Sequence, residues 1–233
     1  MAKIIHLAQV NSTQTYLKEH FSQLPDQTIV YADTQTAGRG RYNRQWISQE
    51  GGLYFSVLLK PAQTRFLANL TQLMAVSVCR AAEKYGVKAN LKWPNDVQVN
   101  GQKLCGMLSE AVPVKNKIAA LIIGVGVNIA QTDLSQVGQP AVSLKALGVA
   151  VEKETFLHEI MQFFWREYPA VTAGGFSTIQ DEFIKRFPFI GQSISVRNGA
   201  QTLHGAVTGV SAKGTLLLTT AAGEQEIYIG DVI

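Results

Sequence analysis

Three arginines and two glycines lie within the nine residues Gly38–Trp46, which read GRGRYNRQW. The guanidinium groups of Arg39, Arg41 and Arg44 stay charged and carry planar sets of donors that suit carboxylate and phosphate groups. The glycines let the backbone come close to a ligand. Because like charges repel, we expect this loop to be mobile until an anion binds. Taken alone, the segment would be interpreted as a solvated basic surface turn.

A second polar cluster changes that interpretation. The run Leu91–Asp96 reads LKWPND and precedes Asn100-Gly101, which lies between two alternating apolar runs. Asn-Gly in this position is a strong hairpin signal, and the pairing of the two strands would bring Asp96 and Lys103 together. An exposed Lys–Asp pair contributes little, but apolar neighbours predict that this pair is partly desolvated.

The most apolar predicted strand, Lys117–Ile129, contains the sequence GVGVN at Gly124 to Asn128. Two alternating glycines in a central strand indicate a close approach of ligand or backbone. The segment is not a Rossmann fingerprint, because the third glycine is missing and no helical pattern opens there.

The elements that position these residues predict an α+β fold, a mixed β-sheet packed with helices. Helical spacing is expected from the cap at Asn11-Ser12-Thr13 to about Phe21, over Phe66–Tyr85, near Ser143–Leu147, over Lys153–Tyr168 and over Thr178–Phe187. Strands are expected over Thr28–Ala32, Leu53–Leu59, Val97–Val99, Lys103–Glu110 and Lys117–Ile129. The composition shifts at Gly191, and the short strands and turns that follow predict a small β-barrel of about five strands.

Composition narrows the class of protein. The chain of 233 residues is 46% hydrophobic and 16% charged, with a formal charge of +4, which is typical of a packed globular enzyme. Its basic residues form no long run, so we expect no nucleic-acid partner. No apolar run is long enough to span a bilayer, so we expect no membrane partner. Two lone cysteines, Cys79 and Cys105, favour reduced thiols in the cytoplasm. The spacing of the histidines does not indicate a zinc site. The sequence has no GxSxG motif, so no covalent nucleophile is indicated.

Four motifs in this order, GRGRYNRQW, KWPNDV, KLCGMLSE and GVGVNI, closely resemble those of the biotin protein ligases, and the match covers nearly the whole chain. The resemblance implies a catalytic domain of the class II synthetase (biotin–lipoate ligase) type over residues 1–189. It also implies a small SH3-like C-terminal β-barrel over residues 190–233. Because the chain starts directly at the catalytic domain, we expect the ligase-only type, without the N-terminal DNA-binding domain of the bifunctional members.

The resemblance also assigns roles by motif position. Catalytic roles fall to Arg41, Lys103 and Asp96. Biotin would be contacted by Ser12, Thr13, Gln14, Gln35, Arg39, Gly40, Arg41, Trp46, Lys103, Gly106, Gly124 and Gly126. The nucleotide would be contacted by Arg39, Arg44, Lys92, Asn95 and Asn128. Mg²⁺ would be held through the phosphates, with Asn128 as the candidate protein ligand. Gln131–Pro140 would fold over the adenylate, although the small Pro140-Ala141 weakens the expected clamp on adenine.

The implied reaction has two steps. The carboxylate of biotin attacks the α-phosphorus of ATP, giving biotinyl-5′-AMP and pyrophosphate, and a lysine of an acceptor protein then attacks the mixed anhydride and releases AMP. The implied partner is the biotin carrier domain of a biotin-dependent carboxylase, and the ligase would be a monomer or a homodimer. ATP, Mg²⁺ and biotin would be required, without a tightly bound prosthetic group.

Three alternatives stay open at this point. A lipoate–protein ligase shares the fold and the acyl-adenylate chemistry, but its own motif pattern is absent. A non-catalytic biotin sensor or repressor is disfavoured by the modest charge and by the missing DNA-binding segment. A generic α+β nucleotide-binding domain would explain one motif but not four in order.

Overall fold

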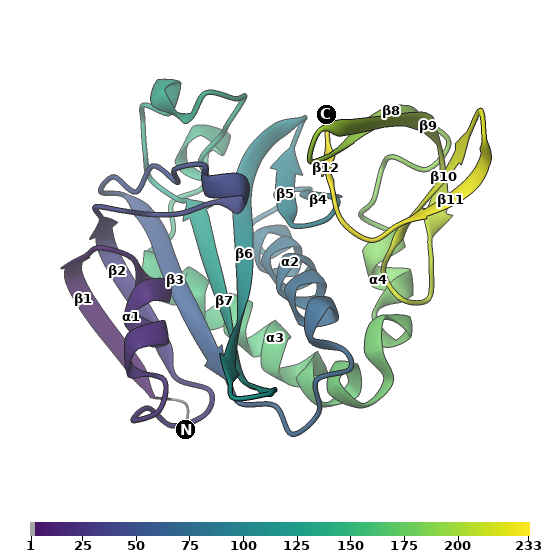
Figure 1. Cartoon of the computed structure of the whole chain (residues 1–233). Helices are drawn as coiled ribbons and strands as arrows, with labels where there is room; N and C mark the ends of the chain where they lie inside the picture. Colours follow the sequence, from purple (N-terminus) through teal and green to yellow (C-terminus); the bar gives the residue numbers. More distant parts are fainter. Residues whose placement is uncertain (1–2) are drawn as a thin grey trace.

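We describe residues 3–233 of a computed structural model, in which a seven-stranded sheet runs through the larger part of the molecule (Figure 1). The strand order is β1-β2-β3-β7-β6-β5-β4. β1 and β2 pair in parallel and the other neighbours pair antiparallel, so the sheet is mixed. The strands are β1 Ile4–Val10, β2 Ile29–Gln35, β3 Gly52–Leu59, β4 Asn90–Lys92, β5 Asp96–Val99, β6 Gln102–Val114 and β7 Lys117–Asn128.

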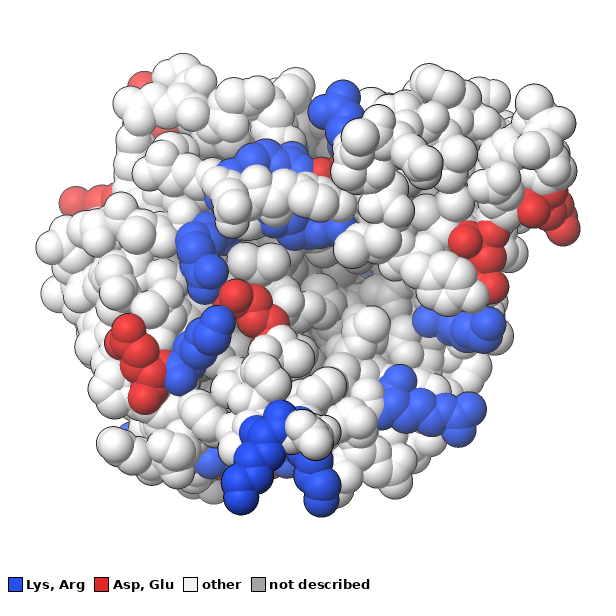
Figure 2. Space-filling view, in the orientation of Figure 1, with Lys and Arg blue, Asp and Glu red and all other residues white. Residues whose placement is uncertain are grey.

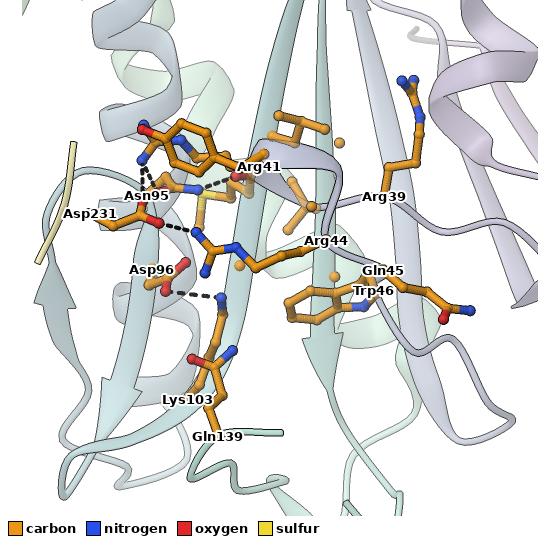
Figure 3. Close-up of a pocket in the computed structure, with 18 of the residues that line it drawn as sticks. Arg39, Arg41, Arg44, Gln45, Trp46, Asn95, Asp96, Lys103, Gln139 and Asp231 are labelled. Atoms are coloured by element: carbon orange, nitrogen blue, oxygen red, sulfur yellow. Dashed lines mark hydrogen bonds and ion pairs between the residues drawn. The ribbon is translucent and has the colours of Figure 1, made fainter. Parts of the chain in front are cut away.

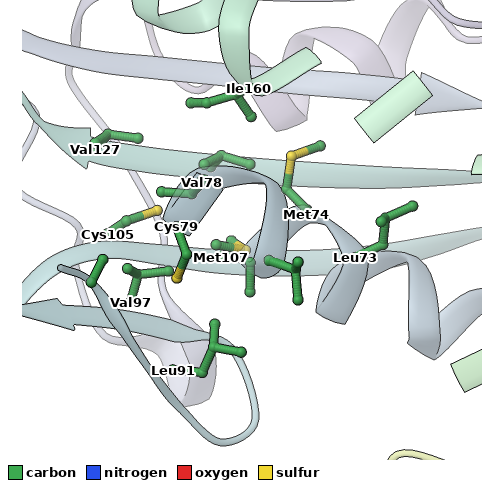
Figure 4. Packing of buried hydrophobic residues seen from close by; sticks show 14 of the residues in the cluster. Leu73, Met74, Val78, Cys79, Leu91, Val97, Cys105, Met107, Val127 and Ile160 are labelled. Atoms are coloured by element: carbon green, nitrogen blue, oxygen red, sulfur yellow. The ribbon is translucent and has the colours of Figure 1, made fainter. Parts of the chain in front are cut away.

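Helices cover both faces of this sheet (Figure 1). They are α1 Thr13–His20, α2 Leu67–Glu83, α3 Lys153–Gly174 and α4 Gln180–Ile184. Side chains alternate between the faces of a strand, and in β3 Phe55 and Val57 join the core under α2 and α3 whereas Leu58 joins the core under α1. Figure 4 shows the α2 face, where Met74 and Cys79 pack among residues of the sheet.

The last part of the chain forms an antiparallel sheet of five strands, as the sequence predicts. Its order is β11-β10-β9-β8-β12. The strands are β8 Ser193–Asn198, β9 Gln201–Val210, β10 Leu216–Thr220, β11 Gly223–Ile227 and β12 Asp231–Val232. The turn between β9 and β10 is fixed to the larger part of the molecule, because the carbonyl of Gly214 accepts from Gln72 Nε2 of α2 at 2.7 Å and from Trp93 Nε1, between β4 and β5, at 3.2 Å. We call this smaller sheet the C-terminal domain.

Two helix boundaries differ from the sequence prediction. α3 runs past the predicted end at Tyr168 to Gly174, with Pro169 inside it. The helix continues because Val171, one turn further, is fully buried in the core, so packing overrides the local cost of proline. The predicted helix over Thr178–Phe187 is shorter: a 3-10 turn at Gly175–Thr178 precedes α4.

The remaining elements agree with the prediction or extend it. Residues Ile4–Val10 lie outside the strands expected above and form β1, whose neighbour in the sheet is β2. The short helix near Ser143–Leu147 is a 3-10 turn at Lys145–Leu147. Among the helices described in residues 3–233, none combines the length and apolar character needed to cross a membrane.

Candidate active site

A cavity of about 680 Å³ opens between the arginine loop Gly38–Trp46, the strands β6 and β7, and the C-terminal domain. Every residue assigned above to catalysis, biotin or nucleotide lines this one cavity. Figure 2 shows a hollow in this place with blue side chains gathered at its upper rim. The motifs, although far apart in the sequence, therefore meet at one site.

The floor of the cavity consists of strand backbone. Gly106 of β6 and Gly126 of β7 are register partners, and Gly124 lies two residues before Gly126 in β7. A Cβ on Gly126 would lie 2.3 Å from the indole of Trp46, and one on Gly124 would lie 2.7 Å from Gln14 Oε1. Any side chain at these positions would occupy the space that Trp46 and Gln14 now take, which explains why glycine stands there.

A network of hydroxyl and amide groups closes one end of the cavity, where α1 begins. Ser12 caps α1 by accepting from the backbone N–H of Thr15 at 3.4 Å. The Oε1 atom of Gln35 accepts from the backbone N–H of Thr13 at 2.9 Å, while its Nε2 atom donates to Ser48 Oγ at 2.9 Å. The side chains of this network hold each other in place, so this end suits a neutral polar ligand group.

Lys103 and Asp96 form the ion pair that the hairpin predicts. Lys103 Nζ lies 2.9 Å from Asp96 Oδ2, and the two side chains are only 12% and 18% exposed. A register shift next to Val97 in the β5–β6 pairing accompanies this arrangement. Lys103 Nζ also lies 5.2 Å from the ring centre of Trp46, so the ammonium group faces the cavity above the glycine floor (Figure 3).

The arginine loop forms the roof of the cavity, and its three guanidinium groups have different partners. Arg41, which is 17% exposed, donates to the carbonyl of Gly230 at 3.0 Å and to Asp231 Oδ1 at 2.9 Å. Arg44 binds the other oxygen of the same carboxylate. Arg39 turns away from them and pairs with Glu110 on β6 at 2.7 Å (Figure 3). The roof is therefore held by Glu110 of the larger sheet and by Asp231 of the C-terminal domain.

Asn128 links two segments around Lys103. Its Nδ2 atom donates to the carbonyl of Lys103 and to that of Val142, each at 3.2 Å. The backbone of Lys103 also donates to the carbonyl of Pro140 at 2.9 Å, and Ala141 lies beside Lys103 in a parallel bridge. The small Pro140-Ala141 segment thus anchors one end of the loop over residues 131–140 against the lysine strand.

The side chains that line the cavity show how the expected Mg²⁺ ion could be held. Within residues 3–233 no group of three or more His, Cys, Asp or Glu side chains gathers as a metal site. The cavity carboxylates, Asp96 and Asp231, are each paired with cationic side chains. Mg²⁺ commonly keeps its waters and binds one or two carboxylates together with substrate phosphates. These residues therefore fit a Mg²⁺ ion held mainly by a nucleotide, and the role of Asn128 toward the ion stays a prediction.

The cysteines lie in the core beside the site. Cys79 and Cys105 are free and buried, as the sequence predicts. Burial raises the pKa of both thiols, so neither supplies a thiolate at neutral pH.

The cavity also includes residues to which no role was assigned above. They are Tyr42, Gln45, Ile47, Ser56, Trp93, Pro94, Met107, Leu108, Val125, Val137, Gln139, Arg197, Gly199, Asp231, Val232 and Ile233. Seven of them lie inside the four motifs and could have been included from the sequence: Tyr42, Gln45, Trp93, Pro94, Met107, Leu108 and Val125. The C-terminal residues carry no local signal, because only the docking of the second sheet brings them to the site.

Comparison with known proteins gives the family. Residues 7–128 match the biotin/lipoate A/B protein ligase family, and residues 189–233 match the biotin protein ligase C-terminal domain. The chain is 33% identical to a bifunctional ligase/repressor of Bacillus spizizenii, over 98% of this chain and 73% of that protein. It is 32% identical to a biotin–[acetyl-CoA-carboxylase] ligase of Paracoccus denitrificans, over 97% and 98% of the two chains.

The fold agrees with these matches. A biotin protein ligase from Aquifex aeolicus, solved in complex with biotin and ATP, aligns with a TM-score of 0.89 at 31% identity, covering 100% of this chain and 98% of that one. The resemblance seen in the four motifs is thereby confirmed over both sheets. The chain belongs to the biotin/lipoate A/B protein ligase family, and within that family it is a biotin protein ligase.

Proposed function

We propose that this chain forms biotinyl-5′-AMP from biotin and ATP, and then transfers biotin to a lysine of the carrier domain of a biotin-dependent carboxylase. The Paracoccus relative is named for acetyl-CoA carboxylase, and the Aquifex relative was solved with biotin and ATP. The observation that carries the proposal is Lys103, a largely desolvated cation that is held by Asp96 above a glycine floor and below two arginines.

The first step brings two anions together, the biotin carboxylate and the α-phosphate. Lys103 Nζ stands at the cavity wall and can contact both groups, and Arg41 and Arg44 supply further positive charge at the roof. Such fixed charges act strongly because the side chains of Lys103 and Arg41 are only 12% and 17% exposed. The family's Mg²⁺, held through the phosphates, would neutralise the triphosphate and assist departure of pyrophosphate.

The second step requires a neutral amine from a lysine that is mostly protonated near pH 7. Asp96 Oδ2 lies at hydrogen-bond distance from Lys103 Nζ, and this carboxylate can accept the proton of the incoming amine. The roof and the loop over residues 131–140 would keep water from the anhydride between the steps.

The two parts of biotin suit different parts of the cavity. We assign its ureido ring to the closed end formed by Thr13, Gln14 and Gln35, whose hydroxyl and amide groups complement a cyclic urea. Its apolar chain would run beside the indole of Trp46, which packs directly on Gly126, toward Lys103. Asn95 accepts from Arg41 at 3.3 Å and Lys92 lies opposite Asp96 in the β4–β5 pairing, and we assign this region of the cavity to the nucleotide.

The biological setting is also proposed. The two buried, free thiols support a cytoplasmic enzyme. Monomer and homodimer both remain consistent with the chain. Residues 1–189 would act as the catalytic domain and residues 190–233 as the SH3-like domain.

The decisive test is biotin-dependent exchange between ATP and pyrophosphate in the presence of Mg²⁺. We expect exchange with biotin and none with lipoate. Lys103→Ala should abolish most of it, whereas Lys115→Ala, in the exposed turn between β6 and β7, should not. Exchange with lipoate instead would make the chain a lipoate ligase, and no exchange despite tight biotin binding would make it a sensor.

A further inference from the structure

Among the carboxylates of residues 3–233, Asp231 is the one that binds two guanidinium groups of the roof, those of Arg41 and Arg44. It lies on β12, in the last three residues of the chain, and 190 and 187 residues separate it from Arg41 and Arg44. We propose that Asp231 is a positioning residue for adenylate formation: it fixes Arg41 and Arg44 over the cavity before ATP binds. This proposal rests on the proposed ligase function.

The loop does not hold this conformation by itself. Tyr42 and Asn43 have φ values of 54° and 57°, a left-handed region that non-glycine residues seldom adopt. The segment around them carries Arg41 and Arg44, whose charges repel each other. The ring of Tyr42 lies 5.1 Å from the guanidinium carbon of Arg41 and 5.6 Å from that of Arg44, so both cations crowd one side chain. A single carboxylate between them offsets much of this repulsion.

The position of Asp231 is in turn fixed by the C-terminal domain. Asp231 pairs with Arg197 in the β8–β12 ladder. The same domain is anchored at Gly214, which accepts hydrogen bonds from Gln72 of α2 and from Trp93 of the KWPND motif. Direct contacts therefore connect α2 and the KWPND turn to the smaller sheet, and the smaller sheet to the roof.

Asp231 leaves the roof capable of binding phosphate. One negative charge faces two positive ones, so a net positive charge remains at the mouth of the cavity. The side chain of Arg44 is 60% exposed, and its donors toward the cavity can engage an anion while Asp231 holds its position. Arg41 is held more tightly, since its Nη1 atom also contacts Asn95 Oδ1 at 3.3 Å.

The test variant, Asp231→Asn, removes the negative charge of this side chain and keeps its shape. In pyrophosphate exchange, Asp231→Asn should raise the KM for ATP about tenfold, because ATP must then order the loop, and should change kcat less. Asp231→Glu should restore part of the affinity. Glu226→Gln is the matched control: it makes the same change in the same domain, where Glu226 binds Thr215 and Tyr228 and does not touch the roof. Its KM for ATP should match that of the wild type.

A second measurement does not depend on activity. Trypsin cleaves after arginine, and ligand-free Asp231→Asn should be cut after Arg41 or Arg44 several times faster than the wild type or Glu226→Gln. Biotin with ATP should restore protection. If the wild type shows no biotin-dependent exchange, the proposed function fails, while the trypsin rates still decide whether Asp231 holds the loop.

Two results would overturn the proposal. One is unchanged KM and unchanged cleavage in Asp231→Asn; the other is a lower KM for ATP, which would mean that Asp231 competes with the triphosphate. If Asp231→Asn unfolds, Arg44→Gln breaks the same contact from the other side. It should then accelerate cleavage after Arg41, and unchanged cleavage there would count equally against the proposal.

Discussion

Replacing Gly126 by alanine tests how the cavity holds biotin. Gly126 lies in the extended backbone of β7, which any residue adopts, and its ladder bonds to β3 and β6 need no side chain. The new methyl group would point into the cavity, at the indole of Trp46. The variant should therefore fold and lose affinity for biotin.

The size of the effect follows from one distance. The added Cβ would lie 2.3 Å from Trp46 Cε2 and Nε1, whereas carbon atoms pack at about 3.5–4.0 Å. The indole must withdraw by more than about 1 Å and leave its place above the floor. Overpacking of this kind costs about 1–3 kcal/mol, which corresponds to a loss of roughly 5- to 150-fold in affinity.

The assay is calorimetric titration of biotin together with the biotin dependence of pyrophosphate exchange. Gly209→Ala is the control, since a Cβ there meets nothing within 4 Å in a strand of the smaller sheet. Thermal unfolding of both variants confirms that they are folded. A biotin affinity within twofold of the wild type in Gly126→Ala would show that the Trp46–Gly126 contact is not part of the biotin site.

Four further outcomes are expected. Arg41→Gly should release biotinyl-5′-AMP faster than the wild type in a rapid gel-filtration assay, and unchanged retention would contradict the role of the roof. Lys103→Ala should slow adenylate formation by about 10²–10³-fold in single-turnover experiments, since one preorganised charge contact contributes about 3–4 kcal/mol. The hydrogen bond from Lys153 lowers the pKa of Asp33 in the fold; this stabilisation is complete above the unfolded pKa of about 3.9 and is lost as the pH falls below it. Acid titration of unfolding should show a smaller loss in Asp33→Asn. Arg186→Met should lower the free energy of unfolding by about 1–2 kcal/mol in urea, because the 6% exposed Arg186 loses its hydrogen bonds to Glu83 and Glu182, while both carboxylates stay partly solvated and Glu182 keeps Arg80.

Local patterns in the sequence predict much of the site. The Asn100-Gly101 turn, with φ values of 51° and 76°, sets the hairpin that brings Asp96 to Lys103. The alternating glycines predict a close approach, and the structure shows Trp46 and Gln14 lying against them. The turn and the glycine pattern each depend on residues that are neighbours in the chain or in one strand. The hydrophobic periodicity and the residue types of the turn are therefore enough to predict them.

Long-range contacts lie beyond such patterns. No local feature of Asp231 distinguishes it from other acidic residues near a strand, and only the docking of the second sheet brings it to Arg41. The partner of Arg39, Glu110, is likewise set by the register of β6. Pro169 predicts a helix end that the buried Val171 overrides.

The floor and the roof of this cavity are built for different tasks. The floor is a ladder of strand hydrogen bonds, which fixes the positions of Trp46 and Gln14, and with them the proposed place of biotin, to within the size of a methyl group. The roof is held by ion pairs of partly exposed side chains, with Arg39 41% and Arg44 60% exposed, and each such pair is individually weak. A weak pair such as Arg39–Glu110 can be exchanged for a phosphate without rearranging the core. Recognition of biotin and closure over the adenylate can therefore change independently, and mutations in the floor should alter biotin affinity while mutations in the roof alter ATP affinity and retention of the intermediate.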